Sequence, residues 1–304
     1  MQKVGKNFKI WGMSYAVIGD LIMGLPMLTY FEKKYPGSYK YWVIKLSCAQ
    51  SLPLFVNHPL IDKIHITGEW DGFNKNDLEL ANSCDIQTVM EGWKHSSPHW
   101  YNQYSCVEET ARLAGIMDMP QVLTEDEMFP KLYKWFKPGH SNIKNHSRAK
   151  HFSENTPLDN VIAIWPFASG ETNRRNAPKN WWNTLIAKLI QMNYIIHHFG
   201  LDHEPDLFES SNYIRYTNLP YFEQVKVSLA SKVAIGTDSG SAWVLGAYSH
   251  PCVNLITNWL PNHKINFYAL APIGKNNVTL FGKDQIDNIS INSVIENIEK
   301  LTTN

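Results

Sequence analysis

The stretch from Thr237 to Gly240 joins two apolar segments through an acidic residue, a hydroxyl group and a glycine. An Asp or Ser at such a position is often a helix cap, because it satisfies free backbone N–H groups. The same N–H groups, together with the helix dipole, form an anion site when a ligand is present. Asp238, Ser239 and Gly240 are therefore consistent with a helix cap or with a ligand-binding corner.

A second polar connection follows the apolar run at 160–167 and contains four residues suited to binding an anion. Ser169 and Gly170 are small, so the backbone can approach a ligand closely. Arg174 and Arg175 carry guanidinium groups, which bind phosphate through paired hydrogen bonds. Adjacent arginines in a loop are more often simply solvated, so this stretch alone does not identify a diphosphate site.

A carboxylate lies near the start of the chain, where Gly19 and Asp20 follow the first apolar run. An Asp at the beginning of a helix is commonly a cap. At the edge of a cleft the same carboxylate would act as a general base. The sequence leaves both interpretations open.

Two further carboxylates, Asp202 and Glu204, follow the apolar run at 194–200. Carboxylates at this point of a Rossmann unit commonly bind ribose hydroxyls. The nearby His197 and His198 raise the alternative of a metal site. Neighbouring residues of a strand point to opposite faces, however, so this geometry disfavours a shared metal ion.

Strand-like and helix-like segments alternate along the whole chain, which predicts βαβ units and parallel sheets. Pro26 either kinks the first helix or lies in the first turn of a helix that begins just before it. Gly115 is expected to cap a helix over 102–116. Strands are expected at residues 8–13, 40–46, 62–67, 83–90, 160–167, 194–200, 232–237 and 251–256, and later helices at 179–193, 221–231, 241–249 and 290–301.

Two such series, separated by a polar segment at 137–160, predict two Rossmann-like domains facing a central cleft. We place these domains at 1–150 and 151–304. The final helix, over 291–302, is a candidate to pack back on the first domain. Ligands of such sheets bind beyond the carboxyl ends of the strands, where the polar residues above are expected.

The composition excludes several classes of protein. The 304 residues are 44% hydrophobic and 18% charged, which is typical of a folded chain with a sizeable core. A net charge of zero does not indicate a nucleic-acid partner. No apolar run reaches the roughly 18 residues of a membrane span. Four scattered cysteines without a Cys-x-x-Cys pair predict free thiols and a cytoplasmic protein.

In this order, the motifs resemble those of glycosyltransferase family 9, the ADP-heptose:lipopolysaccharide heptosyltransferases. The resemblance is carried by "GDLIMGLPMLTYFEKKYP", "NHPLIDKI", "PFAS", "RRNAPKNWW", "HHFGLDHE" and "GTDSGSAWVLGAYSHPCVNLI", and covers nearly the whole chain. It implies the GT-B fold, with the first domain binding the acceptor and the second the nucleotide sugar, and metal-independent transfer that inverts the anomeric centre. It also implies a nucleotide-diphosphate donor, expected to be ADP-linked, and a surface-glycan or lipopolysaccharide-type acceptor. The enzyme would require no cofactor or nucleic acid, and it would associate with the inner face of a membrane at most peripherally.

The resemblance also assigns roles to individual residues. Asp20 matches the family's catalytic base, with Gly19 beside it on the acceptor side. Arg175 falls where the family has a lysine that neutralises the leaving diphosphate, and Asp202 falls where the family has a glutamate on the ribose hydroxyls. The remaining matches place Ser169, Gly170, Arg174, Ser239 and Gly240 at the diphosphate, and Asp238 and Trp243 at the donor sugar.

Two positions depart from the family pattern near the expected donor site. Trp243 stands where the family has a histidine, and Ala177 precedes Pro178 where the family has a tryptophan. Two alternatives therefore stay open. One is a GT-B transferase with another donor sugar or a protein acceptor, and the other is a nucleotide-binding protein without transferase activity.

Overall fold

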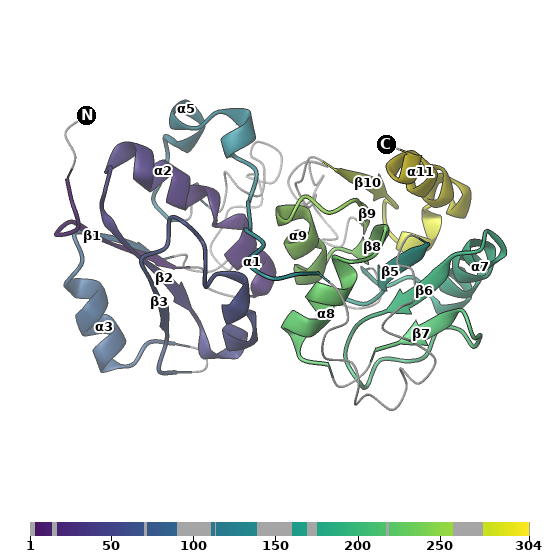
Figure 1. Cartoon of the computed structure of the whole chain (residues 1–304). Helices are drawn as coiled ribbons and strands as arrows, with labels where there is room; N and C mark the ends of the chain where they lie inside the picture. Colours follow the sequence, from purple (N-terminus) through teal and green to yellow (C-terminus); the bar gives the residue numbers. More distant parts are fainter. Residues whose placement is uncertain are drawn as a thin grey trace. The chain divides into compact units, whose positions relative to one another are not determined.

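Two parallel β-sheets form the frame of the protein in a computed structural model, one in each half of the chain (Figure 1). The chain divides into two compact units, Met1–Trp135 and Phe136–Asn304, each containing one sheet. The sequence places the boundary near residue 150, and most of the polar segment expected to link the domains lies outside the described residues. The structure describes residues 4–13, 17–69, 72–89, 111–112, 114–138, 160–168, 175–216, 219–257 and 276–303.

The first sheet has four parallel strands in the order β3-β2-β1-β4. Its central strands β1 and β2 are largely buried and rich in apolar and aromatic residues, whereas the edge strands β3 and β4 are partly exposed. Trp11 and Tyr41 pack with Ala81 on one face, and Trp42 packs against Phe55 on the other. The strands span Lys9–Met13 (β1), Tyr39–Ile44 (β2), Lys63–Ile66 (β3) and Ile86–Val89 (β4).

Two separate helices follow β1, and Pro26 is the first residue of the second, where its missing N–H costs no helical hydrogen bond. Most of the helix predicted over 102–116 lies outside the described residues. Its expected cap is present: Gly115 has a φ of 78°, and the Ile116 N–H donates to the Ala111 carbonyl at 2.9 Å. The helical segments of this unit are Ile18–Met23 (α1), Pro26–Lys34 (α2), Leu46–Leu54 (η1), Lys75–Asn82 (α3), Met119–Val122 (α5) and Glu125–Glu127 (η4).

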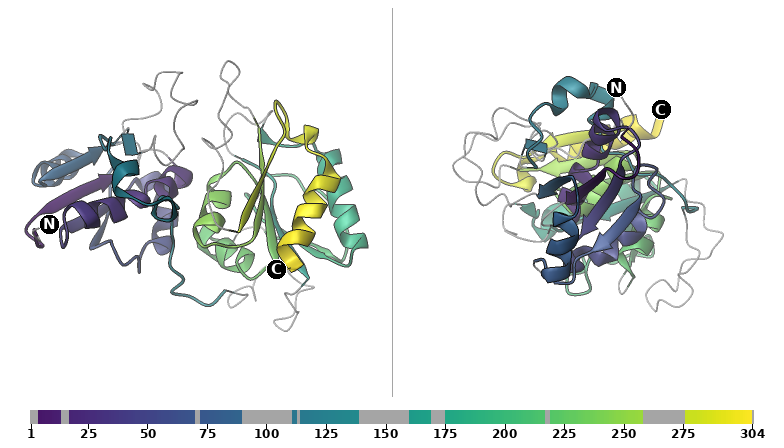
Figure 2. Two further views of the ribbon diagram at one scale, coloured as in Figure 1. Left: turned by 90° about the horizontal axis from the view of Figure 1, so that it is seen from above. Right: turned by 90° about the vertical axis from the view of Figure 1, so that its left-hand side faces the viewer.

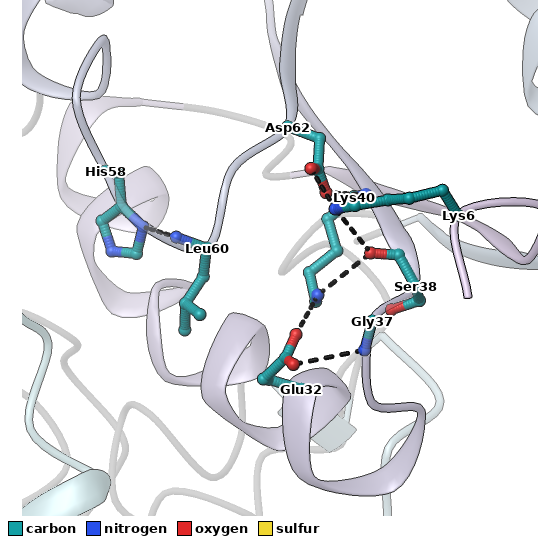
Figure 3. Close-up of polar contacts among 8 residues, drawn as sticks. All are labelled: Lys6, Glu32, Gly37, Ser38, Lys40, His58, Leu60 and Asp62. Carbon is teal, nitrogen blue, oxygen red and sulfur yellow. Dashed lines mark hydrogen bonds and ion pairs between the residues drawn. The ribbon is translucent and has the colours of Figure 1, made fainter. Parts of the chain in front are cut away.

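A group of charged residues forms contacts at the amino ends of strands in the first sheet (Figure 3). The ammonium of Lys40, with a side chain only 3% exposed, pairs with Glu32 of α2 and also donates to the Ser38 carbonyl. Asp62 accepts from the Lys40 backbone N–H at 2.9 Å and pairs with Lys6. These contacts tie β2, α2 and the segment before β3 together.

The second sheet has six parallel strands in the order β10-β9-β8-β5-β6-β7. Numbered within this unit, the order is 3-2-1-4-5-6, the arrangement of dinucleotide-binding Rossmann domains. The sequence did not predict β7 or β10. The strands span Val161–Trp165 (β5), Ile195–His198 (β6), Tyr213–Arg215 (β7), Val233–Thr237 (β8), Cys252–Ile256 (β9) and Asn277–Phe281 (β10).

Helices α7 and α11 cover one face of this sheet, and α8 and α9 lie on the other (Figure 2). The helix predicted at 179–193 is confirmed as α7, and Trp182, Leu185, Ile186 and Leu189 on one of its faces are fully buried. The final helix packs on α7 and on β8 and β9 through an apolar stripe that includes Val294. The helical segments are Lys179–Gln191 (α7), Tyr221–Ser228 (α8), Gly240–Ala247 (α9), Ile286–Asn288 (η6) and Ile291–Thr303 (α11).

The prediction of an α/β chain with two Rossmann-like parallel sheets is confirmed. Among the described helices, none is both long and apolar enough to cross a lipid bilayer.

Candidate functional site

The second sheet brings two of the predicted site residues together at its topological switch point. Strands β5 and β8 are neighbours, with Trp165 opposite Gly236, and the chain leaves them toward opposite sides of the sheet. Ligands of such sheets bind beyond the carboxyl ends of the strands at this point. Arg175 lies in the connection after β5, and Asp238 directly follows β8.

Arg175 and Asp238 contact each other although they are far apart in the sequence. The Nη2 atom of Arg175 lies 3.1 Å from Oδ2 of Asp238, and the same nitrogen donates to the Asp238 carbonyl. Their side chains are only 17% and 10% exposed. Low exposure strengthens a charge pair and holds the guanidinium in one orientation. The cation is therefore fixed at the switch point before any ligand binds.

The beginning of α9 decides between the two interpretations of the Asp238–Gly240 corner. Ser239 is the N-cap residue and its backbone is extended, with φ −145° and ψ 162°, but its side chain makes no capping hydrogen bond. Its Oγ is buried and has no hydrogen-bond partner among the residues that the structure describes. Because Asp238 precedes the cap position and pairs with Arg175, the corner is not an ordinary side-chain cap.

The first turn of α9 packs closely on the strand that precedes it. A Cβ added at Gly236 would lie 3.2 Å from the Cβ of Ala242, so two small residues allow this approach. Trp243, in the same turn, is only 4% exposed. Little of the indole surface is therefore open to a ligand, and this burial favours a packing role.

The turn after β6 carries Asp202, which is exposed. Arg215 of β7 donates to the Leu201 carbonyl at 2.9 Å and pairs with Asp206 at 2.9 Å, which fixes both ends of the turn. Glu204 accepts from the Leu201 N–H at 2.9 Å, and burial raises the pKa of its carboxyl group.

The same turn requires a glycine. Gly200 has a φ of 155°, and an added Cβ would lie 1.9 Å from the Oε2 atom of Glu204. Gln224 of α8 accepts from the Gly200 N–H at 3.1 Å. Sequence reasoning missed the positioning roles of Arg215 and Gln224, because both act through contacts between elements distant in the chain.

The two histidines of β6 are buried within the unit. His198 shares a hydrogen bond with the Tyr213 hydroxyl, and burial lowers the pKa of His198 to about 3, so the ring is neutral at physiological pH. His197 lies near the Tyr216 hydroxyl, at 3.4 Å. In the described part of the chain, no three His, Cys, Asp or Glu side chains form a group that could hold a metal ion.

The first sheet places Asp20 beyond the carboxyl end of β1. Asp20 lies in the first turn of α1 and is not its N-cap, because Val17 is the extended N-cap residue. Its residue exposure is 5%. A carboxylate in this turn is favoured by the helix dipole. Gly19, also buried, precedes it.

Asp20 lies near a buried lysine and a buried thiol at the end of the neighbouring strand β2. Burial raises the pKa of the Cys48 thiol, and the charge of Asp20 raises it further while that of Lys45 lowers it. Lys45 is 9% exposed and follows β2 directly. Ser169, Gly170 and Arg174 lie outside the described residues, so their predicted roles stay predictions.

Comparison with known proteins identifies the fold. Neither protein-family models nor curated proteins give a match to this sequence. Solved structures do: a glycosyltransferase of family 9 from Veillonella parvula DSM 2008 has a TM-score of 0.69 and 13% identity, covering 100% of this chain and 99% of that one. The protein therefore has the GT-B fold.

Two heptosyltransferase structures from E. coli are also similar. ADP-heptose lps heptosyltransferase II has a TM-score of 0.65 and 17% identity, covering 97% of this chain and 99% of that one. Heptosyltransferase WaaC with ADP has a TM-score of 0.56 and 14% identity, covering 97% and 100%. The resemblance seen in the sequence is thus confirmed at the level of the fold.

Proposed function

We propose that the protein is an inverting glycosyltransferase that moves a sugar from a nucleotide-diphosphate donor to an acceptor hydroxyl. The observation that carries this proposal is the Arg175–Asp238 pair at the switch point of the second sheet. It places a fixed cation beside the beginning of a helix, where a diphosphate ligand of a Rossmann sheet binds. The GT-B fold supports the same conclusion.

On the donor side, departure of a nucleoside diphosphate builds negative charge. Arg175 and the N–H groups at Ser239 and Gly240 would stabilise this charge without a metal ion. Ser169, Gly170 and Arg174, from the preceding connection, would complete the diphosphate site.

The remaining donor residues would hold the sugar and the nucleoside. Asp238 would accept hydrogen bonds from donor-sugar hydroxyls. Asp202, exposed on a fixed turn, would accept from the ribose hydroxyls. We propose that Trp243 supports the donor sugar by packing beneath the corner, given its burial.

On the acceptor side, Asp20 would act as the general base. Its carboxylate takes the proton of the acceptor hydroxyl while that oxygen attacks the anomeric carbon. The bond from the anomeric carbon to the phosphate oxygen breaks on the opposite face, and the nucleoside diphosphate leaves with the bonding electrons. Attack and departure on opposite faces invert the configuration.

We propose an ADP-linked donor, with heptose or a similar sugar, and a surface-glycan or lipopolysaccharide-type acceptor. The solved structures support this choice, since their descriptions name ADP, ADP-heptose and lps. The reaction would then occur in the cytoplasm, at the inner face of a membrane.

The test is Asp20→Ala, assayed for transfer and for ADP binding by calorimetry. We expect transfer to fall about 10²- to 10⁴-fold, the usual contribution of a general base, with ADP affinity nearly unchanged. Asp85→Asn is the matched control, because Asp85 is an exposed carboxylate of the same unit at the amino end of β4, bound to the Lys9 N–H at 2.7 Å. Retained turnover in the Asp20 variant would remove it as the base.

A second candidate function is nucleotide binding without transfer. The observation that favours it is the buried Trp243 at the position where the resembled family has a histidine. A panel of nucleotide sugars, scored by thermal shift and then by turnover, separates the two functions. Binding of a donor without release or transfer of its sugar would favour the second.

A further inference from the structure

A pocket of about 260 Å³ opens in the first unit, beside the start of α2. Leu25, Pro26 and Thr29 form one wall at the start of α2. The segment at 58–60 forms the second wall, and side chains from residues 127–133 form the third. The pocket therefore lies within one unit and is formed by segments that its own contacts hold in place.

His58 joins two of these walls. Its Nδ1 accepts from the Leu60 N–H at 3.3 Å (Figure 3), and the ring also makes a hydrogen bond with the backbone of Lys131. The imidazole is 7% exposed and meets the Tyr133 ring edge to face, with centroids 5.1 Å apart. Burial lowers the pKa of His58 to about 4, so a neutral ring serves as a structural bridge here.

The pocket carries both signs of charge. Glu127 accepts from Lys33 at 2.6 Å and from the Thr124 N–H at 2.8 Å, and these bonds hold its pKa at about 2. Lys131 supplies an ammonium group, 3.5 Å from Asp126. A carboxylate and an ammonium on one pocket disfavour a ligand with net charge. They suit a neutral ligand that donates and accepts several hydrogen bonds.

The size of the pocket and its other lining residues further limit the class of ligand that it could bind. Pockets for drug-sized ligands measure about 300–1,000 Å³, so this smaller space fits a molecule of about one ring. Leu25, Leu60 and Phe129 offer apolar contact, and Thr29 adds a hydroxyl. Tyr133, also in the lining, is 44% exposed. A sugar ring has this combination of apolar C–H faces and hydroxyl edges.

We propose that this pocket binds one neutral, pyranose-sized sugar. The inference rests on the proposed function, because it makes the bound ring a second unit of the acceptor, beyond the one that reacts. Asp20 lies in α1, and Leu25 lies between α1 and α2, where its N–H donates to the Ile22 carbonyl at 3.1 Å, so the proposed base and this wall of the pocket are only five residues apart in the chain. The acceptor would then be at least a disaccharide, with one unit at the base and another in the pocket.

The experiment is saturation-transfer NMR on the full chain, without donor, using methyl α-D-mannopyranoside, methyl β-D-glucopyranoside and methyl α-L-rhamnopyranoside. We expect saturation transfer to at least one of them. Tyr133→Ala should weaken that binding about fivefold or more through loss of ring contact, and Thr29→Val should weaken it without changing the fold.

Trp135→Ala is the matched control, since Trp135 is also 44% exposed, two residues along the same segment, and does not line the pocket. Binding should survive in this variant. The proposal is overturned if none of the three sugars binds, or if the Trp135 variant loses binding as much as the Tyr133 variant. Asp20→Ala should keep the NMR signal, so failure of transfer and failure of the pocket are separate results.

Discussion

The two units share the order of their first four strands and carry side chains of opposite charge after the first strand. Strands β3-β2-β1-β4 of the first sheet correspond to β7-β6-β5-β8 of the second, all parallel. In the first unit, the connection after the leading strand carries the carboxylate of Asp20. In the second unit, the equivalent connection carries the guanidinium of Arg175. One backbone arrangement therefore supports a carboxylate in one unit and a guanidinium in the other.

The units also differ in what stabilises their outer layers. In the first unit, charged contacts fasten α2, as in the pairs of Lys33 with Glu127 and of Lys34 with Asp118. In the second unit, α7 and α11 share one continuous apolar cluster with the sheet. The first unit should therefore respond more to pH and salt, because exposed ion pairs are weak and easily screened.

The largest effect that tests the comparison is expected from Arg175→Met. Loss of a donor to the developing charge should lower turnover about 10²- to 10³-fold and raise the Michaelis constant for the nucleotide sugar. Arg175→Lys should retain more activity, since it keeps the charge. Steady-state kinetics with varied donor measures both. If the Met variant lost turnover with unchanged donor binding, as Asp20→Ala should, the division of roles between the units would be wrong.

Asp238→Asn should have the next largest effect, on stability. The amide cannot balance the buried guanidinium of Arg175, which should cost about 3 kcal/mol of unfolding free energy. ADP would supply negative charge in place of the carboxylate. We therefore expect ADP to raise the melting temperature of the variant more than that of the wild type. Equal ADP-induced shifts in a thermal-unfolding assay would show that the diphosphate does not reach Arg175.

His58→Gln tests the pH sensitivity of the first unit and should have the smallest effect. The folded pKa of His58, about 4, lies below the ordinary 6.5, so the unfolded chain binds the extra proton between these values. Stability is therefore complete above pH 6.5 and is lost as the pH falls toward 4. The wild type should lose about 2 kcal/mol between pH 7 and pH 5 through this residue.

The variant should show a smaller loss over the same range, measured by urea unfolding at both pH values. His198, with a pKa of about 3, is present in the second unit of both proteins, so its contribution to the pH dependence is the same in each. Identical pH dependence in the two proteins would contradict the assigned role of His58.

Local sequence signals predicted the regular elements well and the unusual ones poorly. Helix α7 was predictable because its apolar residues repeat at helical spacing. Strand β7 was missed because it has only three residues and ends at Arg215, a charged residue that is 8% exposed. Helix α3 was missed because it is mostly polar, although Asn74 and Asp77 form a capping box that the sequence could have signalled.

In the candidate site too, local sequence signals indicated individual residues but not the contacts between them. The sequence indicated Arg175 and Asp238 separately, because each follows an apolar strand. Their contact depends on β5 and β8 being neighbours, although two other strands intervene in the chain. Only the tertiary arrangement supplies this information, and the same holds for the pocket beside His58.

The packing of α11 on β8 and β9 has a consequence for the order in which the protein forms during synthesis. Strand β5 leaves the ribosome long before α11, by about 6–25 seconds at elongation rates of about 5–20 residues per second. Until α11 emerges, part of the apolar face of the second sheet stays uncovered. The first sheet has all its strands by Val89 and can pair them earlier. A nascent chain paused before Ile291 should therefore bind chaperones through its second unit.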